Sequence, residues 1–265
     1  MRLTIRHTTR YAFDDPVSYG LQQLRKTPKS THQQHVRRWK TTVEGGRREL
    51  GFEDHHNNTV ELISFERDAK ELVVTSEGEL TLEDTSGVVG RHIGPSPLWL
   101  YERQTERTKA GAGIRALARE VGGEDGLDRL HRLMAVVGER VAYEVGASEA
   151  GWSAEEALEA GRGVCQDHTH VFLSAAREMG FPARYVSGYL LLDDRVEQEA
   201  MHAWAEAHLD SLGWVGFDAS NGISPDARYV RVATGLDYGE AAPVTGTRMG
   251  GAGEALSVAI EVAQQ

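Results

Sequence analysis

The sequence predicts an α+β protein in which an N-terminal all-β domain precedes a core of helices packed on an antiparallel sheet. Three observations support this prediction. Apolar residues recur with a period of two from Leu3 to Leu82, the period becomes that of a helix after Tyr101, and strand-like runs return from Ala183 onward. At 265 residues and 40% hydrophobic content, the chain is long enough for one large domain or two modest ones.

The N-terminal region contains short runs in which every second residue is apolar. These runs include Leu3 and Ile5, Tyr11 and Phe13, Val60 and Leu62, Leu72 and Val74, and Leu80 and Leu82. Turn-forming segments such as Asp14–Pro16 and Gly45-Gly46 separate them. The pattern indicates a small sandwich or barrel over residues 1–95, with the domain boundary in the Gly-, Pro- and Ser-containing segment Gly87–Pro97.

Four helices are expected in the second region. Their apolar faces consist of Ile114, Leu117, Ala118 and Val121; of Leu127, Leu130, Met134, Val137 and Val141; of Leu158 in the third; and of Val171, Phe172, Ala175, Ala176 and Met179. Ser153 and Glu156 have the spacing of a capping box, so the third helix is expected to begin at Ser153. Gly180 and Pro182 are expected to end the fourth.

Three strands are expected after the helices. They cover Ala183–Leu192, His202–Leu209 and Trp214–Phe217, and Asp210–Gly213 joins the last two. In the middle strand, small alanines alternate with larger side chains, so the alanine face can pack closely against a helix. We therefore place the catalytic core at residues 96–235, followed by a C-terminal segment, 236–265, that returns to a sheet.

The charge pattern argues against a nucleic-acid partner. The formal net charge is -11, whereas phosphate binding depends on an excess of Lys and Arg. The segments Arg25–Lys29 and Arg37–Lys40 are locally basic, and we interpret them as solvated faces of strands. No membrane partner is expected either, because no run of apolar residues approaches the roughly 20 needed to span a bilayer. Without an export signal at the N-terminus, we expect a cytoplasmic protein.

The chain has one cysteine, Cys165, which excludes an intramolecular disulfide and a zinc site of the usual multi-cysteine kind. Such a residue is either a small buried hydrophobe or a nucleophile. Cys165 follows Gly161-Arg162-Gly163-Val164 and so lies at the start of the fourth helix, where free N–H groups and the helix dipole stabilise a thiolate. The backbone N–H of Cys165 could also bind a developing oxyanion. This context favours the nucleophile.

Two downstream residues could support a thiol nucleophile. His202 could accept the proton of the thiol and later protonate a leaving amine. Asp218 could accept a hydrogen bond from the imidazole and so fix its tautomer. A turn confined to Asp210–Gly213 would pair Leu209 with Trp214 and set Asp218 opposite Ala205, about three residues from the position opposite His202. Bringing Asp218 to His202 then requires strand twist, a bulge or a different turn.

A metal site is the main chemical alternative, because Cys165, Asp167, His168, His170 and His202 could cluster. His168 and His170 are two residues apart, roughly 200° around a helix, and cannot both face one ion. The sequence has no H-E-x-x-H motif. We therefore expect no metal and no cofactor, and assign His168 a satisfied, partly buried role, with Asp167 and His170 as buried polar partners. The pair His55-His56 is expected in a surface turn.

Three motifs, in order, resemble the transglutaminase-like family: Gly161–Asp167 with Cys165, His202–Glu206, and Gly213–Asp218. The resemblance covers most of the chain. Tyr11, Phe13, Pro16 and Val17 resemble the N-terminal domain of bacterial members, and Gly235–Tyr238, Pro243 and Gly246 resemble their C-terminal segment. It implies a papain-like core in which Cys165 is the nucleophile, His202 the general base and Asp218 the orienting acid.

The sequence therefore predicts acyl transfer on an amide or peptide bond through a thioester, with a peptide, protein or other amide as substrate. Hydrolysis, in which water resolves the thioester, and transamidation, in which an amine does, both remain open. The alternative is a binding or scaffold protein that retains the fold without turnover. Trp204, Trp214 and Tyr189 either line a substrate groove or belong to the core, and Asp237 and Tyr238 either border the cleft or form a turn.

Overall fold

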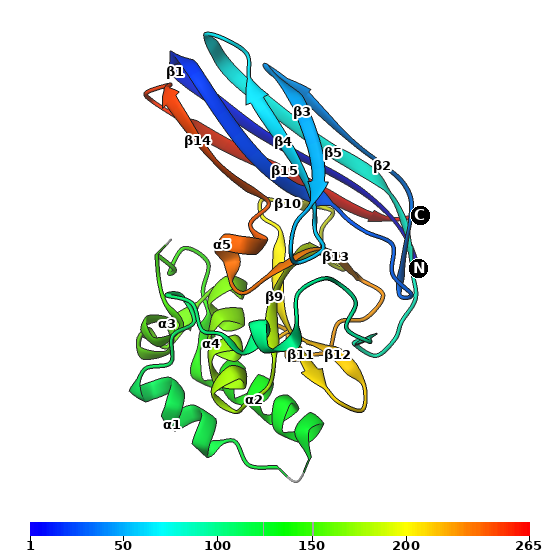
Figure 1. The fold of residues 1–265 in the computed structure, drawn as a ribbon, viewed down its shortest axis with the longest axis vertical. Coiled ribbons are helices and arrows are strands. Elements are labelled where there is room, and N and C mark those ends of the chain that lie inside the picture. Colours follow the sequence, from blue (N-terminus) through cyan, green and yellow to red (C-terminus); the bar gives the residue numbers. More distant parts are fainter. Residues whose placement is uncertain (124, 150) are drawn as a thin grey trace.

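The computed structural model describes residues 1–123, 125–149 and 151–265, and it consists of a β-domain above a helical core (Figure 1). The β-domain contains an eight-stranded sheet, and the core contains a five-stranded antiparallel sheet with helices against it. The β-domain strands in the first part of the chain are β1 (Arg2–Thr27), β2 (Gln34–Glu44), β3 (Gly46–Glu53), β4 (Thr59–Phe65) and β5 (Ala69–Leu82). The predicted order of an N-terminal β-domain and a mixed core is confirmed.

The long strand β1 organises the β-domain. It pairs antiparallel with β4 and β5, and alternate side chains such as Leu3, Ile5 and Phe13 are buried. The turn predicted at Asp14–Pro16 is wrong, because β1 continues through these residues with a register shift between Ala12 and Val17. The backbone N–H groups of Asp14 and Asp15 donate to the Ala252 carbonyl, so a bulge accommodates Pro16 without ending the strand.

The end of the chain also belongs to the β-domain. Both β14 (Val244–Gly250) and β15 (Ala255–Gln264) pair antiparallel with β1, and the short β10 (Glu197–Gln198) pairs with β15 (Figure 1). The core is therefore inserted between β5 and β14. Because it is tied to one sheet at both ends, its position relative to the β-domain is fixed from two sides.

The four predicted helices are present in the core. They are α1 (Ala112–Glu120), α2 (Gly126–Arg140), α3 (Ala154–Ala160) and α4 (Cys165–Glu178). The core also contains a one-turn helix, α5 (Tyr238–Ala241), and a short 3-10 helix, η1 (Leu98–Glu102). The capping box predicted for α3 is confirmed: Ser153 Oγ accepts from the Glu156 N–H at 3.3 Å, and the Glu156 carboxylate accepts from the Ser153 N–H at 2.8 Å. Within the described residues, no helix combines the length and apolarity that crossing a membrane requires.

The core sheet has the strand order β13-β9-β11-β12-β6. Its members are β13 (Tyr229–Gly235), β9 (Ala183–Leu190), β11 (His202–Leu209), β12 (Gly213–Phe217) and β6 (Val88–Gly90). The predicted alanine face of β11 is confirmed, because Ala203, Ala205 and Ala207 are buried in one cluster with Val171 and Phe172 of α4. Small side chains on the strand let the helix axis approach the sheet closely, and this contact positions the start of α4 beside the start of β11.

The expectation that the basic segment Arg25–Lys29 is solvated is wrong for one of its residues. Lys26 is fully buried in the β-domain, where its Nζ donates to Thr9 Oγ1. His7 contacts the same hydroxyl through Nε2 at 3.2 Å and the Tyr189 hydroxyl through Nδ1 at 3.0 Å. Burial lowers the pKa of Lys26 to about 7. No carboxylate among the described residues forms an ion pair with this lysine, so β1 carries an isolated amine inside the domain.

Candidate active site

Cys165 is the first residue of α4, as the sequence predicts, and it is partly buried. Two glycines shape the segment that connects α3 to α4. Gly161 ends α3 in a left-handed conformation with φ of 65°, and a Cβ on Gly163 would lie 2.6 Å from Asp167 Cβ. The Asp167 carboxylate accepts from the Val164 N–H at 2.8 Å and so fixes the first turn. The N–H of Cys165, at the first helical position, has no intrahelical acceptor and can serve a ligand.

Tyr143 lies beside the nucleophile and was not identified from the sequence. It belongs to β7 (Ala142–Tyr143), which pairs in parallel with β8 (Arg162–Gly163), the strand that ends two residues before Cys165. The residue is 55% exposed, and its ring stacks on that of His168 with centroids 6.0 Å apart. Burial raises the pKa of the phenol, and the negative charges of Cys165 and Asp218 raise it further. A two-residue parallel bridge leaves no periodicity in the sequence, so no local pattern could have revealed this placement.

His202, the first residue of β11, hydrogen bonds to Asp218 and lies near Cys165. Its Nε2 donates to Asp218 Oδ2 at 2.6 Å. Burial by itself would lower the pKa of His202, but the hydrogen bonds with Asp218 and Cys165 and the charges of both groups raise it to about 10. Because Nε2 is occupied by the carboxylate, Nδ1 is the nitrogen available to the thiol. The arrangement therefore favours an imidazolium beside Cys165.

The position of Asp218 corrects the predicted hairpin register. Leu209 pairs with Gly213, not with Trp214, and Ala205 pairs with Phe217. Continuing this register sets position 218 opposite Trp204, on the same face as His202, whereas the predicted register would have put it on the alanine face. A shift of one residue moves every side chain of a strand to the other face. Asp218 is thus a diagonal cross-strand neighbour of His202, and the hydrogen bond needs no bulge.

Asp218 is held by five donors. Its Oδ1 accepts from the backbone N–H groups of Ser220 at 3.0 Å and Asn221 at 3.2 Å. Besides the imidazole, Oδ2 accepts from Asn221 Nδ2 at 2.7 Å and from the Tyr229 hydroxyl at 2.8 Å. Burial alone would raise the pKa of Asp218, but the hydrogen bonds from His202, Asn221 and Tyr229 hold it below its usual range. The carboxylate stays ionised and fixed, with Asn221 and Tyr229 as partners that the sequence did not reveal.

The three aromatic residues that the sequence offered as the lining of a groove are core residues. Trp204, Trp214 and Tyr189 are each at most 3% exposed, so none of them offers a groove surface. Trp204 stacks on His202 with an interplanar angle of 28° and meets the Tyr229 ring edge-on at 5.4 Å. This packing restricts the imidazole to the orientation in which it reaches Asp218.

The residues considered for a metal site do not form one around Cys165. Both ring nitrogens of His168 contact backbone carbonyls, those of Val164 at 3.0 Å and Val141 at 2.7 Å, as expected for a satisfied histidine. His170 Nε2 accepts from the Tyr238 N–H at 3.2 Å, and burial lowers the pKa of His170 to about 3. Tyr238 is the first residue of α5, whose N-cap is Asp237, so these two residues form a capped turn.

In the described ranges, one group of three potential ligands lies elsewhere, at His55, His56 and Glu240. The surface position expected for both histidines is wrong for His56, which is 5% exposed. His56 Nε2 donates to Glu240 at 2.7 Å, and Nδ1 lies 3.2 Å from the Tyr101 hydroxyl. Both ring nitrogens are thus engaged in joining the β3–β4 turn to the core.

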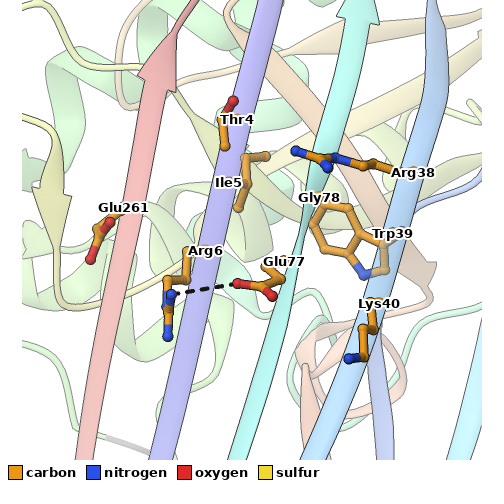
Figure 2. Close-up of a pocket in the computed structure, with 9 residues that line it drawn as sticks. All are labelled: Thr4, Ile5, Arg6, Arg38, Trp39, Lys40, Glu77, Gly78 and Glu261. Atoms are coloured by element: carbon orange, nitrogen blue, oxygen red, sulfur yellow. Dashed lines mark ion pairs between the residues drawn. The ribbon is translucent and has the colours of Figure 1, made fainter.

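A cavity of about 460 Å³ lies far from this chemistry, on the sheet of the β-domain (Figure 2). Its lining comes from β15, β1, β5 and β2 and consists of Thr4, Ile5, Arg6, Arg38, Trp39, Lys40, Glu77, Gly78 and Glu261. The Trp39 indole covers Gly78, where a Cβ would come within 2.5 Å of the ring. Figure 2 shows Arg6 directed at Glu77, with the ion pair at 3.6 Å. This cavity has mixed charges and contains neither a thiol nor an imidazole.

Comparison with known proteins connects both parts of the chain to described families. Residues 115–219 match the family model of the transglutaminase-like superfamily, and residues 3–81 match that of the bacterial transglutaminase-like N-terminal region. An uncharacterized protein of Mycobacterium leprae is 28% identical over 98% of both chains. An uncharacterized protein of Mycobacterium tuberculosis is 35% identical over 39% of this chain and 36% of its own length.

Among solved structures, a candidate cysteine protease from Cytophaga hutchinsonii is similar over the whole chain. The TM-score is 0.78 at 19% sequence identity, and the match covers 99% of this chain and 90% of the other. At this identity the likeness shows the shared fold.

Proposed function

Because this chain combines a transglutaminase-like core with a bacterial transglutaminase-like N-terminal region, we propose that it is a cysteine enzyme that transfers acyl groups from amide bonds. In this proposal Cys165 is the nucleophile, His202 the general acid and base, and Asp218 the residue that orients His202. The observation that carries the proposal is the position of His202, which hydrogen bonds to Asp218 at 2.6 Å and lies close enough to Cys165 for that residue to raise the pKa of the imidazole. An imidazole with a carboxylate on one side and a thiol on the other is the arrangement that a cysteine nucleophile and its base require.

The acylation step follows from these contacts. The Cys165 thiolate attacks the carbonyl carbon of the amide, and the carbonyl electrons form an oxyanion that the N–H of Cys165 can bind. The oxyanion then collapses, the C–N bond breaks, and the imidazolium of His202 gives its proton to the leaving amine. The products are the free amine and a thioester on Cys165. Asp218 stays ionised and stabilises the imidazolium until that proton leaves.

Deacylation returns the site to its initial state. Neutral His202 accepts a proton from an incoming water or amine, whose oxygen or nitrogen attacks the thioester carbonyl. The C–S bond breaks, the thiolate leaves, and the acyl group is released as a carboxylic acid or a new amide. The same groups serve both acceptors, so water and amines compete for one intermediate.

We assign Tyr143 to substrate contact in this reaction. Its half-exposed ring lies on the strand that pairs with Gly163, and the pKa of its phenol responds to burial and then to the charge of Cys165. A neutral phenol at this position can donate a hydrogen bond to the carbonyl oxygen or to the oxyanion. It would supplement the Cys165 N–H, because one donor alone leaves part of the developing charge unsatisfied.

The test is to trap the acyl group. Wild type is incubated with a pool of cell-derived peptides, quenched in acid, and analysed by mass spectrometry for an adduct on Cys165. We expect an adduct in wild type and none in Cys165→Ala. Release by water is then compared with release by added primary amines, which separates hydrolysis from transamidation. If no peptide pool acylates wild type, the alternative of a binding or scaffold protein gains the support that the enzyme proposal loses.

A further inference from the structure

A second cavity, of about 310 Å³, lies where the β-domain meets the core, and Cys165, His202 and Asp218 do not line it. Its lining comes from the β1–β2 loop, the β3–β4 turn, the segment around β6, and strands β9 and β13. The residues are Lys29, Ser30, Thr31, His32, His56, Asn57, Val89, Arg91, Ile93, Arg184 and Arg231. Residues of the β-domain and of the core therefore line one cavity, and none of these residues is acidic.

Two of the arginines share one carboxylate. Arg184 Nε donates to Glu206 Oε2 at 2.6 Å, and Arg231 Nε donates to Glu206 Oε1 at 2.8 Å. Glu206 and Arg184 are buried, and the Arg184 guanidinium lies 3.9 Å from the centre of the Trp214 ring. Burial, opposed by Glu206 and assisted by the charge of Arg231, lowers the pKa of Arg184 to about 10. One buried positive charge is thus left without a counter-charge.

The remaining cations increase this excess. Lys29 is paired with Glu53 at 2.5 Å, but Arg91 forms no ion pair within the part of the chain that the structure describes. Three arginines against Glu206 leave a formal excess of two positive charges, in a chain whose net charge is -11. Such a concentration of one sign, with Arg184 and Glu206 buried at its base, favours the binding of an anion.

Two hydroxyl groups add directional donors. Ser30 Oγ accepts from the Val36 N–H at 3.0 Å, and Thr31 Oγ1 accepts from the Gln34 N–H at 3.3 Å. Since each oxygen already accepts a hydrogen bond, its O–H is left to donate. Guanidinium groups with neighbouring hydroxyls match the tetrahedral oxygens of a phosphate, which arginine binds through two parallel hydrogen bonds.

We propose that this cavity binds a phosphate group, either inorganic phosphate or the dianionic end of a small phosphorylated molecule. The excess of two positive charges matches a dianion. Because Ser30, Thr31 and Lys29 belong to the β-domain while Arg184 and Arg231 belong to the core, a bound phosphate joins the two and stabilises their contact. The site is independent of the chemistry proposed for Cys165.

The direct test is a titration of the full-length protein with inorganic phosphate by calorimetry, at pH 7.5 and at an ionic strength held constant with sodium chloride. Thermal unfolding is followed in parallel. We expect saturable binding and a rise in Tm with phosphate concentration, because the ligand binds the folded state. Arg91→Gln is expected to raise the Kd about tenfold or more, since a charge-assisted hydrogen bond is lost. Arg67→Gln, on an exposed turn, serves as the matched control and should bind like wild type.

Two further measurements decide which anion the cavity prefers and whether it binds there or in the active site. Succinate at equal ionic strength tests a dicarboxylate in place of phosphate, and Cys165→Ala tests whether the active site is involved. Binding that survives in Cys165→Ala and prefers phosphate over succinate supports the proposal. Absence of saturable phosphate binding, equal loss in Arg91→Gln and Arg67→Gln, stronger binding of succinate, or loss of binding in Cys165→Ala would overturn it. Arg91 lies on the exposed segment after β6, so its substitution leaves the core intact.

Discussion

Asp218 accepts a hydrogen bond from His202 at 2.6 Å although the two residues are diagonal, not directly opposite, neighbours in the hairpin of β11 and β12. Pairing of Leu209 with Gly213 puts both side chains on one face of the sheet. Asn221 and Tyr229 then hold the carboxylate from the other side. The geometry that matters for the proposed chemistry thus depends on the length of one short turn.

Thiol reactivity provides the first prediction. With the pKa of His202 raised to about 10, the imidazolium is present at pH 6, and we expect its charge to favour the reactive form of Cys165. Iodoacetamide should therefore alkylate Cys165 at pH 6 at least about tenfold faster than a free thiol. His202→Ala should abolish the advantage. His208→Ala, on the same strand, is the control, and it should react like wild type. Equal rates for wild type and His202→Ala would refute the ion pair.

The orienting role of Asp218 provides the second prediction. Asp218→Asn keeps the shape of the side chain but removes the charge that holds the imidazole tautomer and stabilises the imidazolium. We expect the rate of Cys165 acylation to fall by about 10²- to 10⁴-fold, with a smaller fall for Asn221→Ala. Single-turnover acylation followed by mass spectrometry measures both. Asp68→Asn, in an exposed ion pair with Arg67 on the turn before β5, is the control. A rate unchanged in Asp218→Asn contradicts the role.

Tyr143 provides the third prediction. Tyr143→Phe keeps the ring that stacks on His168 but removes the hydroxyl, so it tests hydrogen bonding separately from packing. Acylation should slow by about 10²-fold if the phenol binds the oxyanion. Alkylation of Cys165 by iodoacetamide forms no oxyanion and should be unaffected. Tyr19→Phe, at an exposed position of β1, is the matched control. Equal slowing of both reactions would indicate a structural role.

The isolated Lys26 provides the fourth prediction, on stability. Its pKa is about 7 in the folded protein and near 10.5 in the unfolded chain, so between these values the unfolded state binds more protons. The contribution of Lys26 to the free energy of unfolding therefore rises with pH across this window and is least favourable below pH 7. Lys26→Met should be more stable than wild type by a few kcal/mol at pH 7. The difference should shrink by pH 9.5.

Urea unfolding at both pH values measures this difference. His202 acts in the opposite direction, because its pKa is raised on folding and its stabilisation is lost as pH approaches about 10. Comparing wild type with Lys26→Met cancels that contribution, since both contain His202. Lys70→Met, exposed on β5, is the control for loss of charge. A difference that does not change with pH would show that Lys26 is not titrating.

Local patterns in the sequence were sufficient for the helices and for the faces of the strands. The start of α4 at Cys165 follows from two glycines and an amphipathic run, and the alternation of β11 follows from its alanines. These features depend on residues within a turn or two of each other, so periodicity and capping chemistry encode them directly.

The same patterns could not predict features that depend on distant partners. The turn predicted at Pro16 is a bulge because Ala252, far along the chain, accepts the hydrogen bonds of Asp14 and Asp15. His56 is buried because Glu240 and Tyr101 meet it. In each case a residue typical of turns or surfaces is held in a strand or in the interior by a partner that is distant in the sequence.

The sequence by itself determined the nucleophile candidate, its place at a helix start, and the strands that carry His202 and Asp218. Only the tertiary structure decided that Asp218 shares a face with His202, that Tyr143 lies beside Cys165, and that cations from both domains face one cavity. The physical reason is that secondary structure arises from neighbours along the chain. Register, burial and charge pairing are set by the contacts that remain once every element has packed.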